Sequence, residues 1–186
     1  MFAPSGSQPR EPSSGQRAPS WCLGIDPGLT RCGYAVIGTG IAGRVDVGCL
    51  GVFTTPPADE LADRLHTLHH DVVSLLDEVV PAVVALERVF FQHNANTAMG
   101  TAQASAIVLL AARERSIPVF HYTPSQVKLA VAGSGSADKA AIRTMVRHRL
   151  SLSVDPQPTD AADAAAVALC HIASAPLAKA ILAGER

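Results

Sequence analysis

Three short apolar segments near the start of the sequence are separated by turns rich in glycine and proline. They run over Trp21–Ile25, Gly33–Gly38 and Val45–Phe53. Each has the length of a β-strand, and the connections are short enough for neighbouring strands to pair as antiparallel hairpins. The pattern therefore predicts a three-stranded antiparallel unit.

From residue 59 the hydrophobic period becomes helical. Leucine and valine recur every three or four residues between Asp59 and Val80, which predicts an amphipathic helix. Ala82–Leu86 is a continuous apolar run, typical of a strand buried on both faces. A further strand is predicted over Pro118–Tyr122, and further helices over Ala95–Arg115, Pro124–Ala132, Ser136–Leu150 and Asp160–Ala173. Ser136 and Thr159 are the expected N-caps of the last two helices, and Pro176 is the expected end of the final one.

Three hairpin strands followed by alternating helices and strands predict an α/β fold. We expect a mixed five-stranded sheet covered by helices, in which the first and fourth strands can be adjacent and parallel. This order of elements resembles that of an RNase H-like domain.

The composition bounds the domain organisation. Residues 1–20 are rich in Pro, Ser and Gly, so we expect a disordered tail. The remainder predicts one domain over residues 21–175 and a short C-terminal segment over residues 176–186. No apolar run approaches membrane-spanning length, and the N-terminus lacks the apolar core of a signal peptide. We therefore expect a cytoplasmic protein with no membrane partner.

The net charge and the cysteine spacing limit which kinds of surface and metal site the chain can have. The formal net charge is −1, which argues against a broadly positive surface of the kind common in nucleic-acid-binding proteins. The four cysteines lack the C-x-x-C spacing of zinc sites, and we expect reduced thiols in or near the core.

Carboxylates stand where the predicted elements begin or end. Asp26 follows the first strand, although Asp-Pro-Gly is also an ordinary turn sequence. Glu87 directly follows the fourth strand. Asp160 and Asp163 are three residues apart on one helix face, where acids also stabilise a first helical turn. If the first and fourth strands are parallel neighbours, Asp26 and Glu87 lie side by side at one edge of the sheet, where we expect the Asp160 and Asp163 pair to join them.

Such a cluster of acids is electrostatically costly without cations. Oxygen ligands with little His or Cys suit Mg²⁺, and Mn²⁺ can substitute. Two such ions about 3.5–4 Å apart can activate water and stabilise the leaving oxygen in phosphoryl displacement. The acids therefore predict metal-dependent phosphodiester hydrolysis.

Four segments together resemble one family. GIDPGLTRCGYAV, LERVFFQHNANTA, QVKLAVAGSGSADK and PTDAADAAAVALCH, in this order, are similar to RuvC-type Holliday-junction resolvases. The resemblance spans roughly Leu23 to His171. It implies an RNase H-like homodimer that nicks four-way DNA junctions symmetrically during recombination and repair, with a RuvA- and RuvB-type branch-migration helicase complex as partner. By position, the implied catalytic metal ligands are Asp26, Glu87, Asp160 and Asp163, with Asp26 as the bridging ligand.

The resemblance and the charge pattern together indicate residues for DNA contact. Lys128 and Lys139 match family lysines near the cut phosphate. Lys139, Arg143 and Arg147 also recur along one helix face, which predicts phosphate contacts or simply a solvated face. Phe90, with Phe91 beside it, could stack on unpaired bases or pack into the core, and the resemblance favours Phe90 for DNA. Arg31 and Arg88 also lie near the carboxylate ends.

Two features depart from the family pattern. Ser105 stands where many members have an arginine, in the helix that the resemblance assigns to the dimer contact. The low net charge predicts weaker non-specific DNA binding or more reliance on the helicase partner.

Three other readings remain open at this point. Strand–Asp–x–Gly–x–Thr also opens actin-like sugar kinases and ATPases, although this chain is short for two lobes. A catalytically silent junction-binding module and a resolvase-like RNA-processing nuclease are the other two. His66, His69 and His70 have metal-binding spacing on a helix, but a solvated face explains them more simply.

Overall fold

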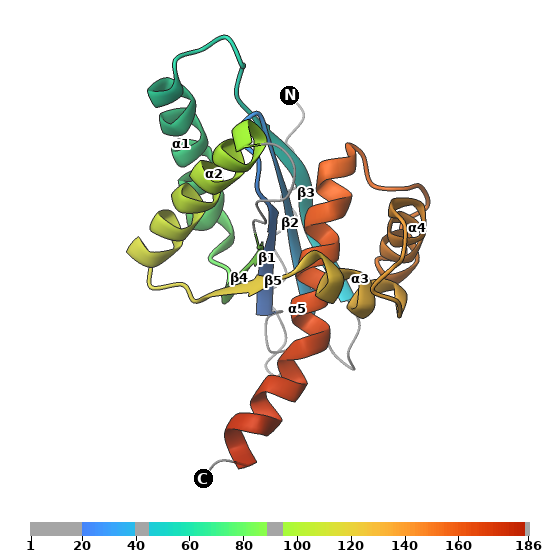
Figure 1. Cartoon of the computed structure of the whole chain (residues 1–186). Coiled ribbons are helices and arrows are strands. Elements are labelled where there is room, and N and C mark those ends of the chain that lie inside the picture. Colours follow the sequence, from blue (N-terminus) through green and yellow to red (C-terminus); the bar gives the residue numbers. More distant parts are fainter. Residues whose placement is uncertain (1–19, 40–44, 89–94, 185–186) are drawn as a thin grey trace, which may run out of the picture.

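A computed structural model describes residues 20–39, 45–88 and 95–184, with the backbone alone for residues 95–97 and 175–184. These residues form one five-stranded sheet in the order β3-β2-β1-β4-β5 (Figure 1). The strands are β1 (Ser20–Asp26), β2 (Arg31–Thr39), β3 (Val45–Thr54), β4 (Val83–Glu87) and β5 (Val119–Tyr122). The mixed sheet expected from the sequence is confirmed, because β1, β2 and β3 pair antiparallel while β1, β4 and β5 pair parallel.

The register between β1 and β4 positions two of the predicted site residues. Ile25 lies opposite Leu86 in this parallel pair. Asp26 and Glu87 each follow by one residue, so they end neighbouring strands at the same edge of the sheet. The expectation that the first and fourth strands are adjacent and parallel is confirmed.

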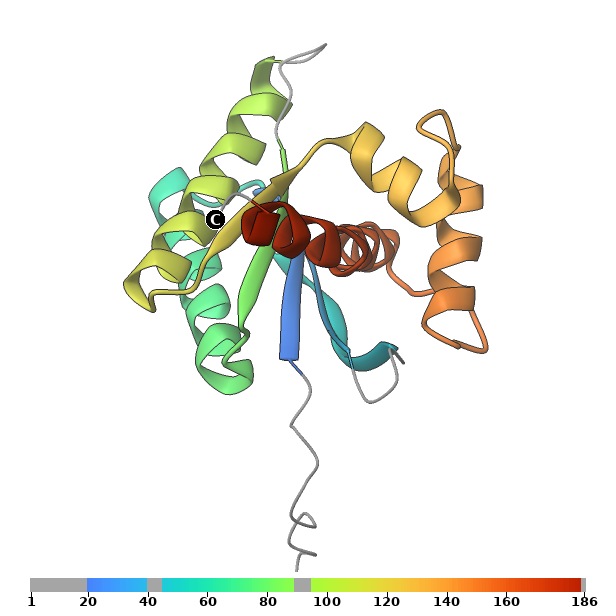
Figure 2. The same ribbon diagram turned by 90° about the horizontal axis from the view of Figure 1, so that it is seen from below.

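Helices cover the two faces of the sheet in separate groups. On one face, α1 (Leu61–Val79) and α2 (Ala95–Glu114) pack against buried β1 and β4 side chains such as Leu23 and Val84. The other face carries α3 (Pro124–Ala132), α4 (Lys139–Arg149) and α5 (Thr159–Gly184). Figure 2 shows the two groups on opposite sides of the sheet. Burying apolar surface on both faces explains why β4 is an uninterrupted apolar run.

Helix α5 lies unusually close to β1 and β2 because glycines face it. A Cβ on Gly24 would collide with the carbonyl oxygen of Ala164 and with Ala168. A Cβ on Gly33 would collide with the carbonyl group of Asp160. Gly33 is the register partner of Asp26, so this close packing carries the start of α5 to the end of β1.

Two predicted helix ends differ from the structure. Asp138, rather than Ser136, caps α4, and its side chain accepts a hydrogen bond from the Ala141 amide at 2.7 Å. A carboxylate is a strong acceptor, and the Ser136 hydroxyl instead lies 2.9 Å from that of Ser134. The expected end at Pro176 is wrong, because α5 continues to Gly184. A helical proline removes one hydrogen bond, and the surrounding Ala and Leu residues favour the helix strongly enough to span it.

The remaining expectations concern cysteines, membrane helices and the tail. All four cysteines are free; Cys22, Cys32 and Cys170 are buried and Cys49 is half-buried, which agrees with the expected positions in or near the core. Burial raises the pKa of Cys22 to about 12, so it is an unreactive core thiol. Within the described ranges, every helix is too short or too polar to cross a lipid bilayer. Except for Ser20, the predicted tail lies outside the described residues.

Candidate active site

The edge of the sheet where β1 and β4 end holds a half-buried pair of carboxylates. Asp26 and Glu87 share a side-chain hydrogen bond. Burial and, after it, the nearby charges of Glu87, Asp163 and Asp160 together raise the pKa of Asp26 to about 8. Since all three acids act on Asp26, the structure brings the four predicted carboxylates together.

The pKa of Glu87 depends on the neighbouring acids and on two lysines. Burial, followed by the charge of Asp163, raises the pKa of Glu87. The hydrogen bond from Asp26 and the charges of Lys139 and Lys128 act in the opposite direction. Both lysines that match the family pattern therefore lie near the carboxylates, on the N-terminal end of α4 and on α3.

Asp160 is held by an arginine that begins β2. Both Nη2 and Nε of Arg31 donate to Oδ2 of Asp160, at 2.7 and 3.0 Å. Arg31 was expected only to lie near the carboxylate ends, and its direct pairing with Asp160 was not anticipated. The two residues are 129 positions apart and meet only because α5 packs onto Gly33, two residues after Arg31.

Asp163 has a looser cationic neighbour. Lys139 Nζ lies 3.4 Å from Asp163 Oδ2, and the Lys139 side chain is 84% exposed. An exposed lysine at this distance is free to move to another anion at small cost. The cluster therefore has one fixed counter-ion, Arg31, and one exchangeable counter-ion, Lys139.

The donor set fits a hard divalent cation, although the side chains are not arranged around one. Carboxylates that raise one another's pKa favour a bound cation, which would relieve their repulsion. Among the described residues, no group of three or more His, Cys, Asp or Glu side chains has the geometry of a metal site. Asp160 binds Arg31 and Asp163 approaches Lys139, in each case through Oδ2, so these two cations compete with a metal ion for the same carboxylates.

The other predicted DNA contacts have varied surroundings. Arg147 Nε lies 3.5 Å from Asp155 Oδ1, a separation that makes an ion pair but no hydrogen bond. Arg143 is half-buried, and its Nε has no hydrogen-bond partner within the described part of the chain. Only Lys139 of the predicted basic face is thus both exposed and next to the carboxylates. Phe90 and Phe91 lie outside the described residues.

Histidine and serine residues singled out in the sequence have ordinary environments. His69 and His70 lie 3.9 and 3.8 Å from Glu114 and Asp71, and the described residues contain no histidine cluster with metal-site geometry. Ser105 is buried and donates to the Thr101 carbonyl at 2.9 Å. This position of the helix thus holds a small hydroxyl whose hydrogen bond is made within the helix.

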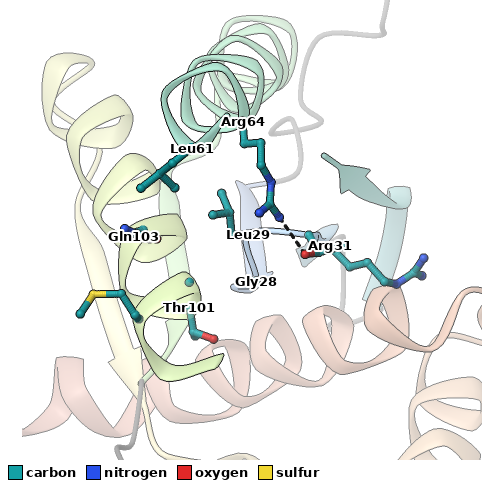
Figure 3. A pocket seen from close by; sticks show the side chains of 10 residues that line it. Gly28, Leu29, Arg31, Leu61, Arg64, Thr101 and Gln103 are labelled. Carbon is teal, nitrogen blue, oxygen red and sulfur yellow. Dashed lines mark hydrogen bonds between the residues drawn. The ribbon is translucent and has the colours of Figure 1, made fainter. Parts of the chain in front are cut away.

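A cavity of about 630 Å³ adjoins the carboxylate edge (Figure 3). Its walls come from the β1–β2 turn, the first turn of α1 and the first half of α2. Arg64 on α1 reaches the turn and donates to Thr30 at 2.8 Å and to Thr55 at 3.1 Å. No sequence motif marks Arg64 as a site residue, because its contacts with Thr30 and Thr55 depend on how α1 packs against the turn.

Comparison with known proteins agrees with this geometry. The family model "Crossover junction endodeoxyribonuclease RuvC" matches residues 22–171. The protein of that name from Streptomyces avermitilis is 54% identical over 155 residues, which cover 83% of this chain and 88% of the relative. Its namesake from a Mycobacterium species is 48% identical over 163 residues, 88% of each chain.

Solved structures share the fold. Thermus thermophilus RuvC is 36% identical with a TM-score of 0.79, covering 85% of this chain and 96% of that one. The same protein in complex with a Holliday junction substrate has a TM-score of 0.81, covering 86% and 96%. A yeast mitochondrial Holliday junction resolvase, at 14% identity and a TM-score of 0.60 over 82% and 78%, shares the fold alone. The RNase H-like fold class is confirmed, and the kinase and RNA-processing readings are excluded.

The sequence motifs, the sheet topology and the carboxylate edge thus agree with a family match that covers most of the chain. The chain belongs to the RuvC family of crossover junction endodeoxyribonucleases.

Proposed function

We propose that this protein resolves four-way DNA junctions by paired, symmetric nicks during recombination and repair. The observation that carries the proposal is the convergence of Asp26, Glu87, Asp160 and Asp163 at one edge of the sheet, in a chain with this family match. A relative of 36% identity has been solved with a Holliday junction substrate, which supports the same substrate class here.

The four acids would hold the metal, with Mg²⁺ as the natural ion, Mn²⁺ as a substitute and two ions per site. When bound, these ions supply positive charge that activates water and stabilises the leaving oxygen. The charges of the other three acids all raise the pKa of Asp26, which is the proposed shared ligand. Glu87 and Asp163 would complete the set with Asp160, whose Oδ2 binds Arg31 and whose Oδ1 could bind the metal.

Cationic residues would position the DNA. Lys128 and Lys139 already act on Glu87, which is consistent with a place beside the cut phosphate. Arg143 and Arg147 would contact the backbone further along the strand, and Phe90 would stack on an unpaired base near the branch point. Moving Lys139 from Asp163 to a phosphate costs little because the side chain is largely exposed.

Two symmetric nicks require two active sites, and we propose that a second copy of the chain supplies the other. Helix α2 presents Met99, Leu109 and Leu110 to solvent, with 57%, 36% and 52% of each residue exposed. Large exposed apolar side chains on one helix are typical of a surface that another protein covers. We propose that α2 forms the homodimer contact.

A DNA junction as substrate also suggests a protein partner and a cellular compartment. A net charge of −1 supplies little general attraction for DNA. Delivery to the junction by a branch-migration helicase complex of the RuvA and RuvB type would compensate for it. Work on chromosomal DNA would take place in the bacterial cytoplasm.

A nicking assay tests the proposed function. Four-way junctions and linear duplexes are incubated with the protein, with and without Mg²⁺. We expect Mg²⁺-dependent cleavage of junctions only, and Asp26→Asn should bind the junction but lose nicking by at least about a thousandfold, since it removes a ligand shared by the site. Asp77→Asn, which removes a carboxylate on α1 away from the cluster, is the matched control. Full nicking by Asp26→Asn would refute the metal-site assignment.

A further inference from the structure

The cavity beside the carboxylate edge is a second feature of this part of the molecule. Residues 28–31 form one of its walls, and they directly follow Asp26 and Pro27. The opposite walls are the first turn of α1 and the first half of α2 (Figure 3). Its volume of about 630 Å³ is in the range of pockets that hold a nucleotide-sized ligand.

The charge of the cavity is positive. Among the described residues that line it, two are arginines and none is acidic; they are Gly28, Leu29, Thr30, Arg31, Leu61, Arg64, Met99, Gly100, Thr101 and Gln103. Arg31 is paired with Asp160, and Figure 3 shows its side chain directed away from the cavity. Arg64 therefore supplies the positive charge that faces the cavity.

The Arg64 guanidinium is held by neutral groups. Its Nη2 donates to the Thr30 hydroxyl at 2.8 Å, and its Nε donates to the Thr55 hydroxyl at 3.1 Å. Within the described ranges, no carboxylate pairs with it. A guanidinium has five N–H donors, so three are not used by these two hydroxyls, and no described carboxylate neutralises its charge.

The same contacts fix the guanidinium in place. Thr55 is only 2% exposed, and its hydroxyl donates to the Leu29 carbonyl at 2.5 Å. The Thr55 amide also donates to the Thr30 carbonyl at 3.1 Å. Arg64, Thr55 and the turn form one network, so little conformational entropy remains to be lost when an anion binds.

We infer that this cavity binds a backbone phosphate of the DNA strand, next to the phosphate that is cut. The inference rests on the proposed junction-cleaving function and adds a second phosphate site to it. A planar guanidinium with paired donors matches the oxygens of a phosphate. Gln103 can donate to the same group or to its neighbour, and the exposed Leu61 can contact deoxyribose.

The test measures junction binding without cleavage. All variants carry Asp26→Asn, and affinity for a four-way junction is measured by fluorescence anisotropy in EDTA at several salt concentrations. Adding Arg64→Gln should weaken binding by roughly tenfold and reduce the log–log salt slope by about one. An unchanged affinity and slope would overturn the phosphate site.

A chemical probe identifies the ligand as one particular phosphate. Neutral methylphosphonates replace single phosphates around the cut position, one junction at a time. One replacement should weaken binding to the Arg64 form and leave binding to the Arg64→Gln form unchanged, because that phosphate and Arg64 form one interaction. Equal losses for both forms at every position would contradict the inference.

A second variant separates the ligand contact from support of the turn. Gln103→Glu keeps the side-chain shape and places a negative charge in the cavity wall. It should weaken junction binding about as much as Arg64→Gln, with an unchanged melting temperature. The control is His70→Glu, which adds the same charge six residues further along α1 than Arg64. His70 is largely exposed, and this variant should leave binding nearly unchanged.

The outcomes distinguish the two proposals. If the Asp26→Asn parent fails to bind junctions, the proposed function is wrong and the phosphate site fails with it. If the parent binds and Gln103→Glu behaves like His70→Glu, only the phosphate site is wrong.

Discussion

At the scale of single residues, the site balances four acids against few cations. Arg31 compensates Asp160 and Lys139 approaches Asp163, while Asp26 has no such direct partner among the described residues. The charges of Glu87, Asp163 and Asp160 all raise the pKa of Asp26. Its environment explains the raised pKa, because both burial and like charges disfavour the ionised form.

Asp26 predicts a pH dependence of stability in the absence of metal. Its pKa is about 8 in the folded protein and 3.8 as the reference value, so the folded state binds the proton more tightly. The stabilisation is complete below about pH 4 and is lost as the pH rises through about 8. We expect the free energy of unfolding to fall by about 3 kcal/mol between pH 5.5 and 8.

Urea unfolding in EDTA at the two pH values measures this difference. Asp26→Asn should remove most of it, whereas Asp77→Asn should retain it because Arg115 lowers the pKa of Asp77. Added Mg²⁺ should stabilise the wild-type protein more at pH 8 than at pH 5.5, since it binds the ionised acids. If the free energy of unfolding of Asp26→Asn still fell between pH 5.5 and 8, other groups would be responsible for the pH dependence.

At the scale of elements, the docking of α5 decides where the second pair of acids lies. Its buried alanines and the glycines of β1 and β2 bring the two backbones together. Asp160 meets Gly33, which pairs with Asp26 in the sheet. A small change in this packing would therefore move half of the site.

Gly24→Ala tests the contact between α5 and β1. The added methyl would meet the backbone of Ala164 and Ala168, which cannot rotate away. We expect a loss of about 2–3 kcal/mol of unfolding free energy, as for other overpacked cores, measured by urea denaturation. Gly100→Ala in α2 meets only Leu29 at an ordinary 3.5 Å and should be neutral or stabilising by up to about 1 kcal/mol. Similar losses in both variants would show that the α5 contact is not tight.

At the scale of the whole molecule, a neutral chain acts on a polyanion. With a formal net charge of −1, we expect DNA affinity to come from a few placed cations and from the proposed pairing of two copies. Arg64 and Lys139 are the described cations that best fit this role, one in the cavity and one at the carboxylates. The apolar surface of α2 would bring two such sets together.

The assembly prediction uses one exposed leucine on α2. Leu110→Glu should convert the dimer to a monomer, because burying an unpaired carboxylate in an apolar contact is costly. Light scattering after size-exclusion chromatography measures the mass. Leu129→Glu, at a 59% exposed position on α3, makes the same change elsewhere and should remain dimeric. If both variants have the same mass, α2 is not the interface.

Much of the architecture was predictable because it depends on neighbouring residues. Periods of two and of three to four separate strands from helices, and both are local properties. The positions of Asp26 and Glu87 at strand ends, and the helix-face spacing of Asp160 and Asp163, also follow from local sequence. The helix ends at Ser136 and Pro176 were missed because competing caps and surrounding helix formers decide them.

The sequence by itself determined the order of the elements, the set of four acids and the family motifs. The tertiary structure alone decided which groups meet: Arg31 with Asp160 across 129 positions, and Arg64 with the turn after β1. These contacts depend on how α1 and α5 pack against the sheet. Packing is a property of the whole fold, and no local period records it.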